Sequence, residues 1–359
     1  MSRASDAPIR LAWPDVGAAE ADAVAAVLAD GMLTMGPRVE EFERGLASAC
    51  ETWHAVAVSS GTAALHLALL ALDIGPGDEV LVPAYTFPAT ANVVALCGAR
   101  PRLVDVDPRT MNLDMAQLER LVWPRTRAVM AVHLFGRPLD WEALESVIPE
   151  GVPIIEDAAG ALGARWKGKP CGGLGALGCL SFHPRKIVTT AEGGAVLTND
   201  ESRALAIRRL RHHGIEPDGD FEIAHAGFNY RLADVLCAIG IPQLNRLEEL
   251  LQARERMAQA YDERLKGVDK PSADEGDRHG WQAYVVQLDR RDEALAALRE
   301  AGIEAQIGTY ALNLLAAYRD QGSFPGAEAC FHRALALPFH SRLTERDLDR
   351  VAKIVRRFS

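Results

Sequence analysis

The sequence predicts an α/β protein in which a large domain carries a mostly parallel sheet covered by helices on both faces, and a smaller C-terminal domain is α+β. Three observations predict this. Short apolar runs alternate with amphipathic stretches from about residue 55 to residue 200. The apolar runs show little polar alternation, as expected for strands buried on both faces. The length of 359 residues exceeds that of one typical domain.

The elements of the large domain follow in order along the chain. Strands are expected at 55–60, 79–84, 102–107, 127–133 and 152–157, with helices between them at 62–73, 88–98, 113–122 and 139–147. Repeated β-α units favour parallel strands joined by right-handed crossovers. Two further strands at 178–184 and 194–199 precede a helix at 203–214, which ends at a glycine.

The C-terminal part has a different pattern. A long helix is expected from about 231 to 266, and it could connect the two domains. A polar loop at 266–280 follows it. The strand WQAYVVQLD and the helix ALAALREAG come next, as in a small α+β domain. We therefore expect a large domain at 1–245, which includes an N-terminal segment, and a small domain at 246–359.

Composition excludes some classes of function. The formal net charge of −10 argues against nucleic acid as a partner, because phosphate backbones require clustered basic residues. The N-terminus has no apolar signal core, and no apolar run reaches 18 residues. We expect no membrane partner and a cytoplasmic location. The six cysteines have neither CxxC pairing nor zinc-ligand spacing, so we expect buried thiols and no metal site.

The segment SSGTAAL (59–65) lies where a strand ends and a helix begins. Small residues there let backbone N–H groups approach a ligand, and a helix N-terminus favours an anion. The hydroxyls of Ser60 and Thr62 could add donors. The segment is neither a GxGxxG fingerprint nor a P-loop. The simpler alternative is that Ser-Gly-Thr only caps the helix.

Asp157 ends the strand VPIIED, at the sheet edge where open α/β proteins bind ligands. Burial of a carboxylate is costly unless a cation or hydrogen-bond donors meet it. A ligand contact is one interpretation of this residue. The alternative is that Asp157 caps the segment that follows it.

Lys186 stands in SFHPRKIVTTAEGG, between an apolar strand and a glycine-rich turn. Only six of the 39 basic residues are lysines, so this chain uses arginine wherever positive charge alone is needed. A lysine in an apolar pocket has a lowered pKa, and its neutral amine forms Schiff bases with carbonyls. Arginine stays protonated and cannot do this. The alternative is an ordinary exposed lysine.

Together these segments supply the three anchors that pyridoxal phosphate requires. Its phosphate needs donors, its pyridine nitrogen needs a carboxylate, and its aldehyde needs a lysine amine. The spacings of about 95 residues from Thr62 to Asp157 and 29 from Asp157 to Lys186 fit one site built from several strand ends.

The chain resembles the DegT/DnrJ/EryC1/StrS family, the sugar aminotransferases of pyridoxal-phosphate fold type I. The resemblance runs nearly from end to end. The segments that carry it are DGMLTMGPRVEEFE, SSGTAALHLALLAL, GPGDEVLVPAYTFPATANVV, PRLVDVDPRTMNLD, AVHLFGRP, IIEDAAGALGA, GCLSFHPRK, AEGGAVLTND and GFNYRLADVLCAIGIPQL.

The resemblance implies a role for each matched residue. Lys186 matches the lysine that binds the cofactor covalently, and Asp157 matches the carboxylate that pairs with the pyridinium nitrogen. The other matched cofactor residues are Gly61 and Thr62 in the phosphate turn, Ser181 on the phosphate, Phe87 stacking on the ring, and Asn229 reaching the phosphate of a neighbouring subunit. For Phe87 the alternative is a core phenylalanine. The implied assembly is a homodimer with shared active sites.

The implied activity is transfer of an amino group, with glutamate as the expected donor, to a keto group on a nucleotide-linked sugar. A cyclitol ketone (an inosose) is the alternative acceptor. A non-catalytic, cofactor-binding regulator is a less favoured alternative. Two positions depart from the family pattern. Gly160 stands where many relatives have Gln or His near the ring, so one contact is missing or replaced by water. Asn313 stands where relatives often have His.

Overall fold

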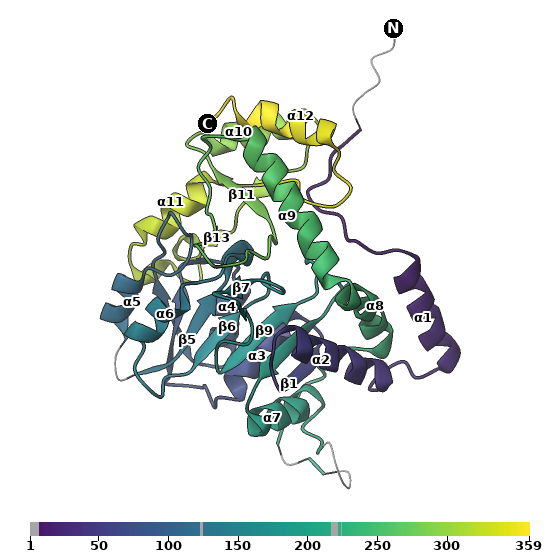
Figure 1. Ribbon diagram of the computed structural model, residues 1–359. Helices are drawn as coiled ribbons and strands as arrows, with labels where there is room; N and C mark the ends of the chain where they lie inside the picture. The colour runs from purple at the N-terminus through teal and green to yellow at the C-terminus, as the bar shows by residue number, and fades with distance from the viewer. Residues whose placement is uncertain (1–6, 123–124, 217–221, 224) are drawn as a thin grey trace.

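The centre of the molecule is a seven-stranded sheet (Figure 1). The computed structural model describes residues 7–122, 125–216, 222–223 and 225–359. The strands in spatial order are β1 (His54–Val58), β10 (Gly194–Thr198), β9 (Leu177–Ser181), β6 (Ile154–Asp157), β5 (Thr126–Val132), β2 (Glu79–Pro83) and β4 (Arg100–Val104). From β9 to β4 all neighbours are parallel, whereas β10 is antiparallel to β9 and β1. The expectation of a mostly parallel sheet is confirmed.

Helices cover both faces of this sheet, which explains why its strands lack polar alternation. One face packs against α3 (Gly61–Leu70), α4 (Ala89–Leu96) and α7 (Glu201–Arg211), and the other against α2 (Pro37–Ala49), α5 (Met115–Leu121) and α6 (Trp141–Val147). Strand β2 shows the consequence. Val80 and Val82 pack into the core below α3 and α4, whereas Leu81 packs into the core on the opposite face.

The expectation of one helix from 231 to 266 is wrong, because the chain breaks it at Arg246. Two helices form, α8 (Asp234–Asn245) and α9 (Leu247–Arg264), and Arg246 lies between them with φ −113° and ψ 22°. Its guanidinium donates to the carbonyl oxygen of Asp15 at 2.6 Å and to Oε1 of Glu20, in α1 (Ala18–Asp30), at 3.0 Å. These contacts are remote in sequence, so helical periodicity does not show them.

Helix α9 leads from the large sheet to a smaller region of sheet and helices (Figure 1). There β11 (Tyr284–Gln287), β14 (Ala334–Leu337) and β12 (Gln306–Ile307) form an antiparallel sheet that packs with α10 (Arg291–Glu300) and α12 (Glu345–Val355). Ile9 belongs to the same core and pairs with Ile303. This is the smaller α+β unit that the sequence predicts, and the division at residues 245/246 stays a prediction.

Shorter elements complete the described chain. They are β3 (Tyr85–Thr86), β13 (Tyr310–Ala311), β7 (Arg165–Trp166), β8 (Lys169–Pro170), α11 (Pro325–Arg333), and the 3-10 helices η1 (Leu134–Gly136), η2 (Leu312–Leu314) and η3 (Arg319–Gln321). The six cysteines are free thiols, and all except Cys97 are buried. Over the residues described, no helix is both long enough and apolar enough to cross a membrane.

Candidate active site

The three predicted anchors meet at one edge of the large sheet. Strands β6 and β9 are parallel neighbours, so their carboxyl ends lie together, with Asp157 opposite Cys179. Cys179 packs in the core under α3 and α4. Ser181 is two residues further along β9 and therefore lies on the same face. The start of α3 reaches this edge because β1 joins β9 through β10.

Gly61 and Ser181 are in close contact at the start of α3. A Cβ atom on residue 61 would lie 2.8 Å from Cβ of Ser181 and 3.2 Å from its Oγ, so only glycine fits. Ser60 caps the helix, because its Oγ accepts a hydrogen bond from the Ala63 N–H at 3.0 Å. Thr62, the second residue of α3, has an exposed side chain. The donors that this helix start offers to an anion are therefore the N–H groups of Gly61 and Thr62 and the hydroxyls of Thr62 and Ser181.

Asp157 is buried, with 7 % of its surface exposed, and the protein holds both carboxylate oxygens. Oδ2 accepts a hydrogen bond from the hydroxyl of Thr90 at 2.7 Å, and Oδ1 accepts one from the Ala159 N–H at 3.2 Å. Asp157 therefore caps the next turn and also has a buried partner in α4. Thr90 does not stand out in the sequence, because a threonine near a helix start is ordinary.

Lys186 lies in the turn after β9, where its N–H donates to the carbonyl oxygen of His183 at 2.8 Å. The side chain is partly buried. Desolvation lowers the pKa of Lys186 to about 8; Asp157 acts in the opposite direction, and the positive charges of Arg254 and Arg185 add to the lowering. A neutral amine is thus accessible near physiological pH. This environment does not fit an ordinary exposed lysine.

Phe87 and Asn229 are both exposed, but they lie at different parts of the site. Phe87 is 62 % exposed and its ring contacts that of Tyr310 with centroids 6.4 Å apart, so the alternative of a core phenylalanine is wrong. Asn229 lies beside the end of β1, because the N–H of Ser59 donates to the carbonyl oxygen of Tyr230 at 2.8 Å. Within the described chain, no contact engages the Asn229 amide.

Gln282 occupies the space next to Gly160. A Cβ on residue 160 would lie 3.1 Å from Cγ of Gln282 and 3.3 Å from its Cβ. The side-chain amide of Gln282 reaches the turn that contains Lys186, where its Nε2 donates to the carbonyl oxygen of Arg185 at 2.7 Å. Sequence reasoning missed Gln282. Its only local signal is a polar residue inside the apolar run WQAYVVQ, which does not reveal a partner so distant in the chain.

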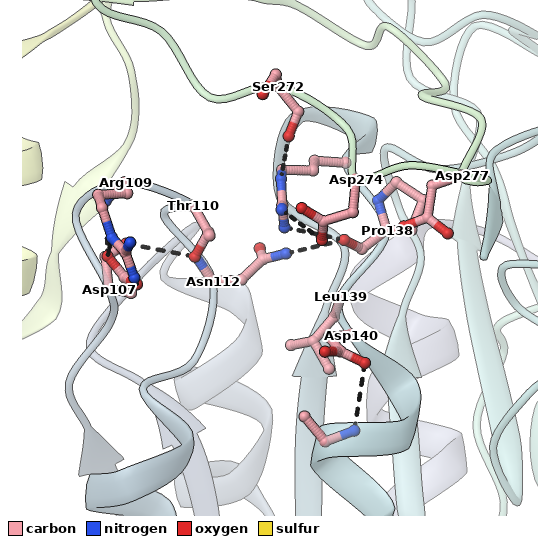
Figure 2. Close-up of polar contacts among 12 residues, drawn as sticks. Asp107, Arg109, Thr110, Asn112, Pro138, Leu139, Asp140, Ser272, Asp274 and Asp277 are labelled. Carbon is pink, nitrogen blue, oxygen red and sulfur yellow. Dashed lines mark hydrogen bonds and ion pairs between the residues drawn. The ribbon is translucent and has the colours of Figure 1, made fainter. Parts of the chain in front are cut away.

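The segment that delivers Gln282 is fixed to the large sheet. The N–H of Gly280 donates to the carbonyl oxygen of Gly136 at 2.8 Å, and the N–H of Gln282 donates to that of Phe135 at 3.0 Å. Further back, Nε of Arg137 donates to the carbonyl oxygen of Ser272 at 2.6 Å. Figure 2 shows Ser272 and Asp274 above the strand ends, with Asp274 beside Pro138. These backbone hydrogen bonds fix the position of residue 282, and thereby the place from which its side chain extends.

A separate hollow of about 730 Å³ lies around the ends of β4 and β5 (Figure 2). Its lining includes Asp107, Asn112, Arg137, Asp140 and Asp274. The chain itself engages several of these groups, since Nη2 of Arg137 lies 2.8 Å from Oδ2 of Asp274 and Oδ1 of Asp140 accepts from the Ala143 N–H at 3.2 Å. None of the predicted site residues lines this acidic hollow.

Asn313, the second departure from the family pattern, is buried in η2. Its Nδ2 donates to Oε1 of Glu328 at 2.7 Å, and Oδ1 has no hydrogen-bond partner in the described part of the chain. The preceding strand β13 pairs with β3, and Phe87 directly follows β3. Asn313 therefore belongs to the structure that supports one side of the site.

The residues at the sheet edge fit pyridoxal phosphate. The close approach of Gly61 to Ser181 leaves no room for a side chain at residue 61, and with the Ala63 N–H bonded to Ser60, the N–H groups of Gly61 and Thr62 are those open to an anion. Asp157 has a carboxylate fixed by two donors with further acceptor capacity. Where the structure is described, the Lys186 amine has no hydrogen-bond acceptor. Phosphate donors, a carboxylate and an amine thus share one edge.

Comparison with known proteins agrees with this chemistry. Residues 14–356 match the model of the DegT/DnrJ/EryC1/StrS aminotransferase family. The chain is 43 % identical over 330 residues to the GDP-perosamine synthase of Caulobacter vibrioides, covering 89 % of each protein.

Solved structures give the same result. The aminotransferase TlmJ from Streptoalloteichus hindustanus superposes with a TM-score of 0.93 at 35 % identity, over 97 % of this chain and 98 % of that one. The putative sugar aminotransferase Spr1654 from Streptococcus pneumoniae, in its PMP form, superposes with a TM-score of 0.91 at 30 % identity, over 96 % of both chains. Spr1654 is also similar in its PLP form.

Proposed function

Because the chain belongs to the DegT/DnrJ/EryC1/StrS aminotransferase family, we propose that it transfers an amino group from glutamate to the keto group of a nucleotide-linked sugar. The family and the similar structures make it a sugar aminotransferase with pyridoxal phosphate as its cofactor. The observation that carries the proposal is the Lys186 amine, with a pKa lowered to about 8, at the same sheet edge as Asp157 and the donors of α3.

The nucleotide-linked acceptor is supported by the relative that is named GDP-perosamine synthase, at 43 % identity. A cyclitol ketone is the alternative acceptor. Asn313 is the observation that keeps this alternative in view, because it replaces a residue type that relatives often use in the segment next to the substrate.

Each site residue has a proposed task toward the cofactor. Gly61, Thr62 and Ser181 hold the phosphate, Phe87 covers the ring, Asp157 faces the pyridine nitrogen, and Lys186 holds the cofactor covalently. The geometry described above supports these roles: open helix N–H groups, an exposed Phe87, a fixed Asp157 carboxylate and an amine without an acceptor in the described chain.

Pyridoxal phosphate, when bound, withdraws electrons from the carbon that carries the reacting nitrogen. The remaining tasks belong to the protein. The amine of the donor first displaces Nζ of Lys186 from its covalent bond to the cofactor. The freed Nζ then takes a proton from the α-carbon of the donor as a general base and returns one as a general acid. The carboxylate of Asp157 stabilises positive charge at the ring nitrogen, and the Thr90 hydroxyl holds that carboxylate in place.

The active form is proposed to be a homodimer with shared sites. The exposed amide of Asn229 has no partner in the described chain and would reach the phosphate bound by the partner subunit. The acidic chain is proposed to act in the cytoplasm, without a nucleic-acid or membrane partner.

A two-stage assay tests this function. The cofactor-loaded protein is first mixed with single amino acids, and loss of the visible absorption band of the cofactor is followed. We expect glutamate to cause this loss, whereas a non-catalytic cofactor-binding regulator would keep its band. The protein, whose cofactor now carries the amino group, is then supplied with nucleotide-linked keto sugars or inososes. Recovery of the band with inososes alone would overturn the nucleotide-sugar assignment.

A further inference from the structure

Arg185, which directly precedes Lys186, is a cation without a carboxylate partner in the described chain. Its side chain is exposed, and Nη1 donates to Oε1 of Gln306 at 2.8 Å, a neutral acceptor. Several other arginines of this acidic protein are paired with carboxylates. Those paired with carboxylates at 3.1 Å or less include Arg208, Arg211, Arg246 and Arg278. The guanidinium at residue 185 therefore retains donors for an anionic ligand.

Arg185 is held at both ends. Its carbonyl oxygen accepts a hydrogen bond from Nε2 of Gln282 at 2.7 Å, and its N–H donates to Nδ1 of His183 at 3.3 Å. The guanidinium is fixed separately by Gln306, which lies on β12 of the smaller sheet. A planar guanidinium fixed in this way is preorganised for a carboxylate, because less side-chain entropy is lost on binding.

The surroundings of Arg185 have an excess of positive charge. Arg185 adjoins Lys186 in the chain, and Gln282 bonds to both arginines, because its carbonyl oxygen accepts from Arg254 and its Nε2 donates to the Arg185 carbonyl oxygen. The positive charges of Arg254 and Arg185 both lower the pKa of Lys186. Arg254 donates to the carbonyl oxygens of Trp281 and Gln282, at 2.8 and 3.3 Å, and to no carboxylate in the described chain. Asp157 is the carboxylate that acts on Lys186 in the opposite direction. Such a cluster favours an anionic substrate group.

We propose that Arg185 binds the carboxylate of the amino donor, with Gln306 holding the guanidinium in position. This inference rests on the proposed function. An α-amino acid carries its α-carboxylate on the same carbon as the reacting amine, so its receptor must lie close to Lys186. Arginine can bind a carboxylate through two parallel N–H donors. The diphosphate of a nucleotide-linked sugar is the other oxyanion that this group could bind, and the two half-reactions distinguish them.

The first test uses Arg185→Gln in the cofactor-loaded protein. We expect the glutamate concentration that gives the half-maximal rate of band loss to rise about 10- to 100-fold, because the variant lacks a pair of charge-assisted hydrogen bonds to the carboxylate. Cofactor affinity should change by less than about twofold, and the absorption band should keep its position. The matched control is Arg109→Gln, an exposed arginine paired with Asp107 at the separate acidic hollow, which should leave both quantities unchanged.

A second test does not depend on turnover. Glutarate, a dicarboxylate without an amine, is titrated into the cofactor-loaded protein by calorimetry. Arg185→Gln should weaken glutarate binding by a factor similar to that for glutamate. Gln306→Glu keeps the arginine but places a carboxylate at its acceptor site, so it should also weaken glutarate binding about 10-fold or more. Gln306→Leu should have an effect of only a few-fold.

The outcomes separate the inference from the function beneath it. Suppose that the wild-type protein reacts with glutamate, and that the Arg185→Gln and Gln306→Glu variants both bind glutarate as tightly as the wild type does. The inference is then wrong and the proposed function stands. If Arg185→Gln weakens only GDP binding and the keto-sugar half-reaction, the residue binds the diphosphate and the inference is also wrong. If the wild-type protein reacts with no amino acid, both fail.

Discussion

The side chain of Gln282 lies where a side chain on residue 160 would project, 3.1 Å from Cγ of Gln282 to the position of a Cβ on Gly160. The two residues are therefore alternatives for one space. A glycine after Asp157 allows a residue from the start of the smaller unit to approach the lysine turn, where Nε2 of Gln282 meets the carbonyl oxygen of Arg185.

Gly160→Gln should be destabilising, because the new side chain and Gln282 cannot both keep their positions. We expect a loss of about 1–3 kcal/mol in the free energy of unfolding, as for other overpacked sites. Gln282→Ala should cost little alone and should recover part of the loss in the double variant. Urea unfolding of the four proteins measures the coupling. Gly75→Gln is the control, since the nearest atom to its Cβ position is the carbonyl oxygen of Cys97 at 3.9 Å. Strictly additive effects would contradict the shared space.

The sequence predicted the sheet well, because its signal is local. Apolar runs such as EVLVPA and VPIIED became β2 and β6 with small shifts at their ends. The edge at which Asp157 ends its strand was predictable from parallel β-α topology alone. The break at Arg246 was not, because the contacts to Asp15 and Glu20 come from the N-terminal segment.

The residues of the site likewise fall into those that the sequence predicts and those that it does not. Lys186 and Asp157 were noticeable because their chemistry is unusual where they occur. Thr90 and Gln282 are ordinary in their local segments, and they enter the site only because folding brings α4 and the start of the smaller sheet to the same edge. Periodicity and residue type carry no information about such contacts between distant segments.

Lys186→Ala should abolish amino transfer and the visible absorption band of the bound cofactor, because no amine remains to hold it. Lys186→Arg keeps a positive charge but should also lack both, since arginine stays protonated. Spectra and half-reaction rates check this. Lys169→Ala, a substitution at an exposed lysine, should leave both unchanged. Full activity of the Lys186→Ala protein would exclude the mechanism.

Capture of pyridoxal phosphate by the cofactor-free protein should depend on pH with a midpoint near 8. Burial lowers the pKa of Lys186 to about 8 from the usual 10.5 of a lysine, so the neutral amine becomes the main form above that pH. The rate should rise up to about pH 8 and level off. Stopped-flow absorbance from pH 6 to 10 measures it, with N-acetyl-lysine amide as the unburied reference. A midpoint near 10.5 would show that desolvation is absent.

The lowered pKa also has a consequence for stability. Between pH 8 and 10.5 the unfolded chain binds a proton at Lys186 that the folded chain does not, so stability at this residue rises with pH in that window. Below pH 8 the cost of burying the charge is fully present. Lys186→Met should therefore stabilise the cofactor-free protein at pH 7 by about 2–3 kcal/mol. Urea unfolding at pH 7 and at pH 10 should show the difference shrinking.

Thr90→Val tests the support of Asp157. The substitution removes the donor 2.7 Å from Oδ2 while keeping the shape of the side chain. Asp157 keeps its bond from the Ala159 N–H, so we expect the rate of band loss with glutamate to fall about 10-fold, a part of the loss expected for Asp157→Asn. Thr198→Val, at a buried threonine of β10 that donates to the Ala176 carbonyl oxygen, is the control. Equal rates for wild type and Thr90→Val would show that the carboxylate needs no such donor.

Shared sites can be tested by mixing two defective proteins. Asn229→Asp places a negative charge where the amide is proposed to meet a phosphate, and it should weaken cofactor binding at least 10-fold. Lys186→Ala cannot hold the cofactor covalently. If Asn229 serves the site of its neighbour, a mixed dimer contains one site that combines an intact Lys186 from one chain with an intact Asn229 from the other. Cofactor titration after mixing and refolding should then show a class of sites with wild-type affinity and a normal band. If Asn229 serves its own chain, every site in the mixture carries one of the two defects, and no such class can form.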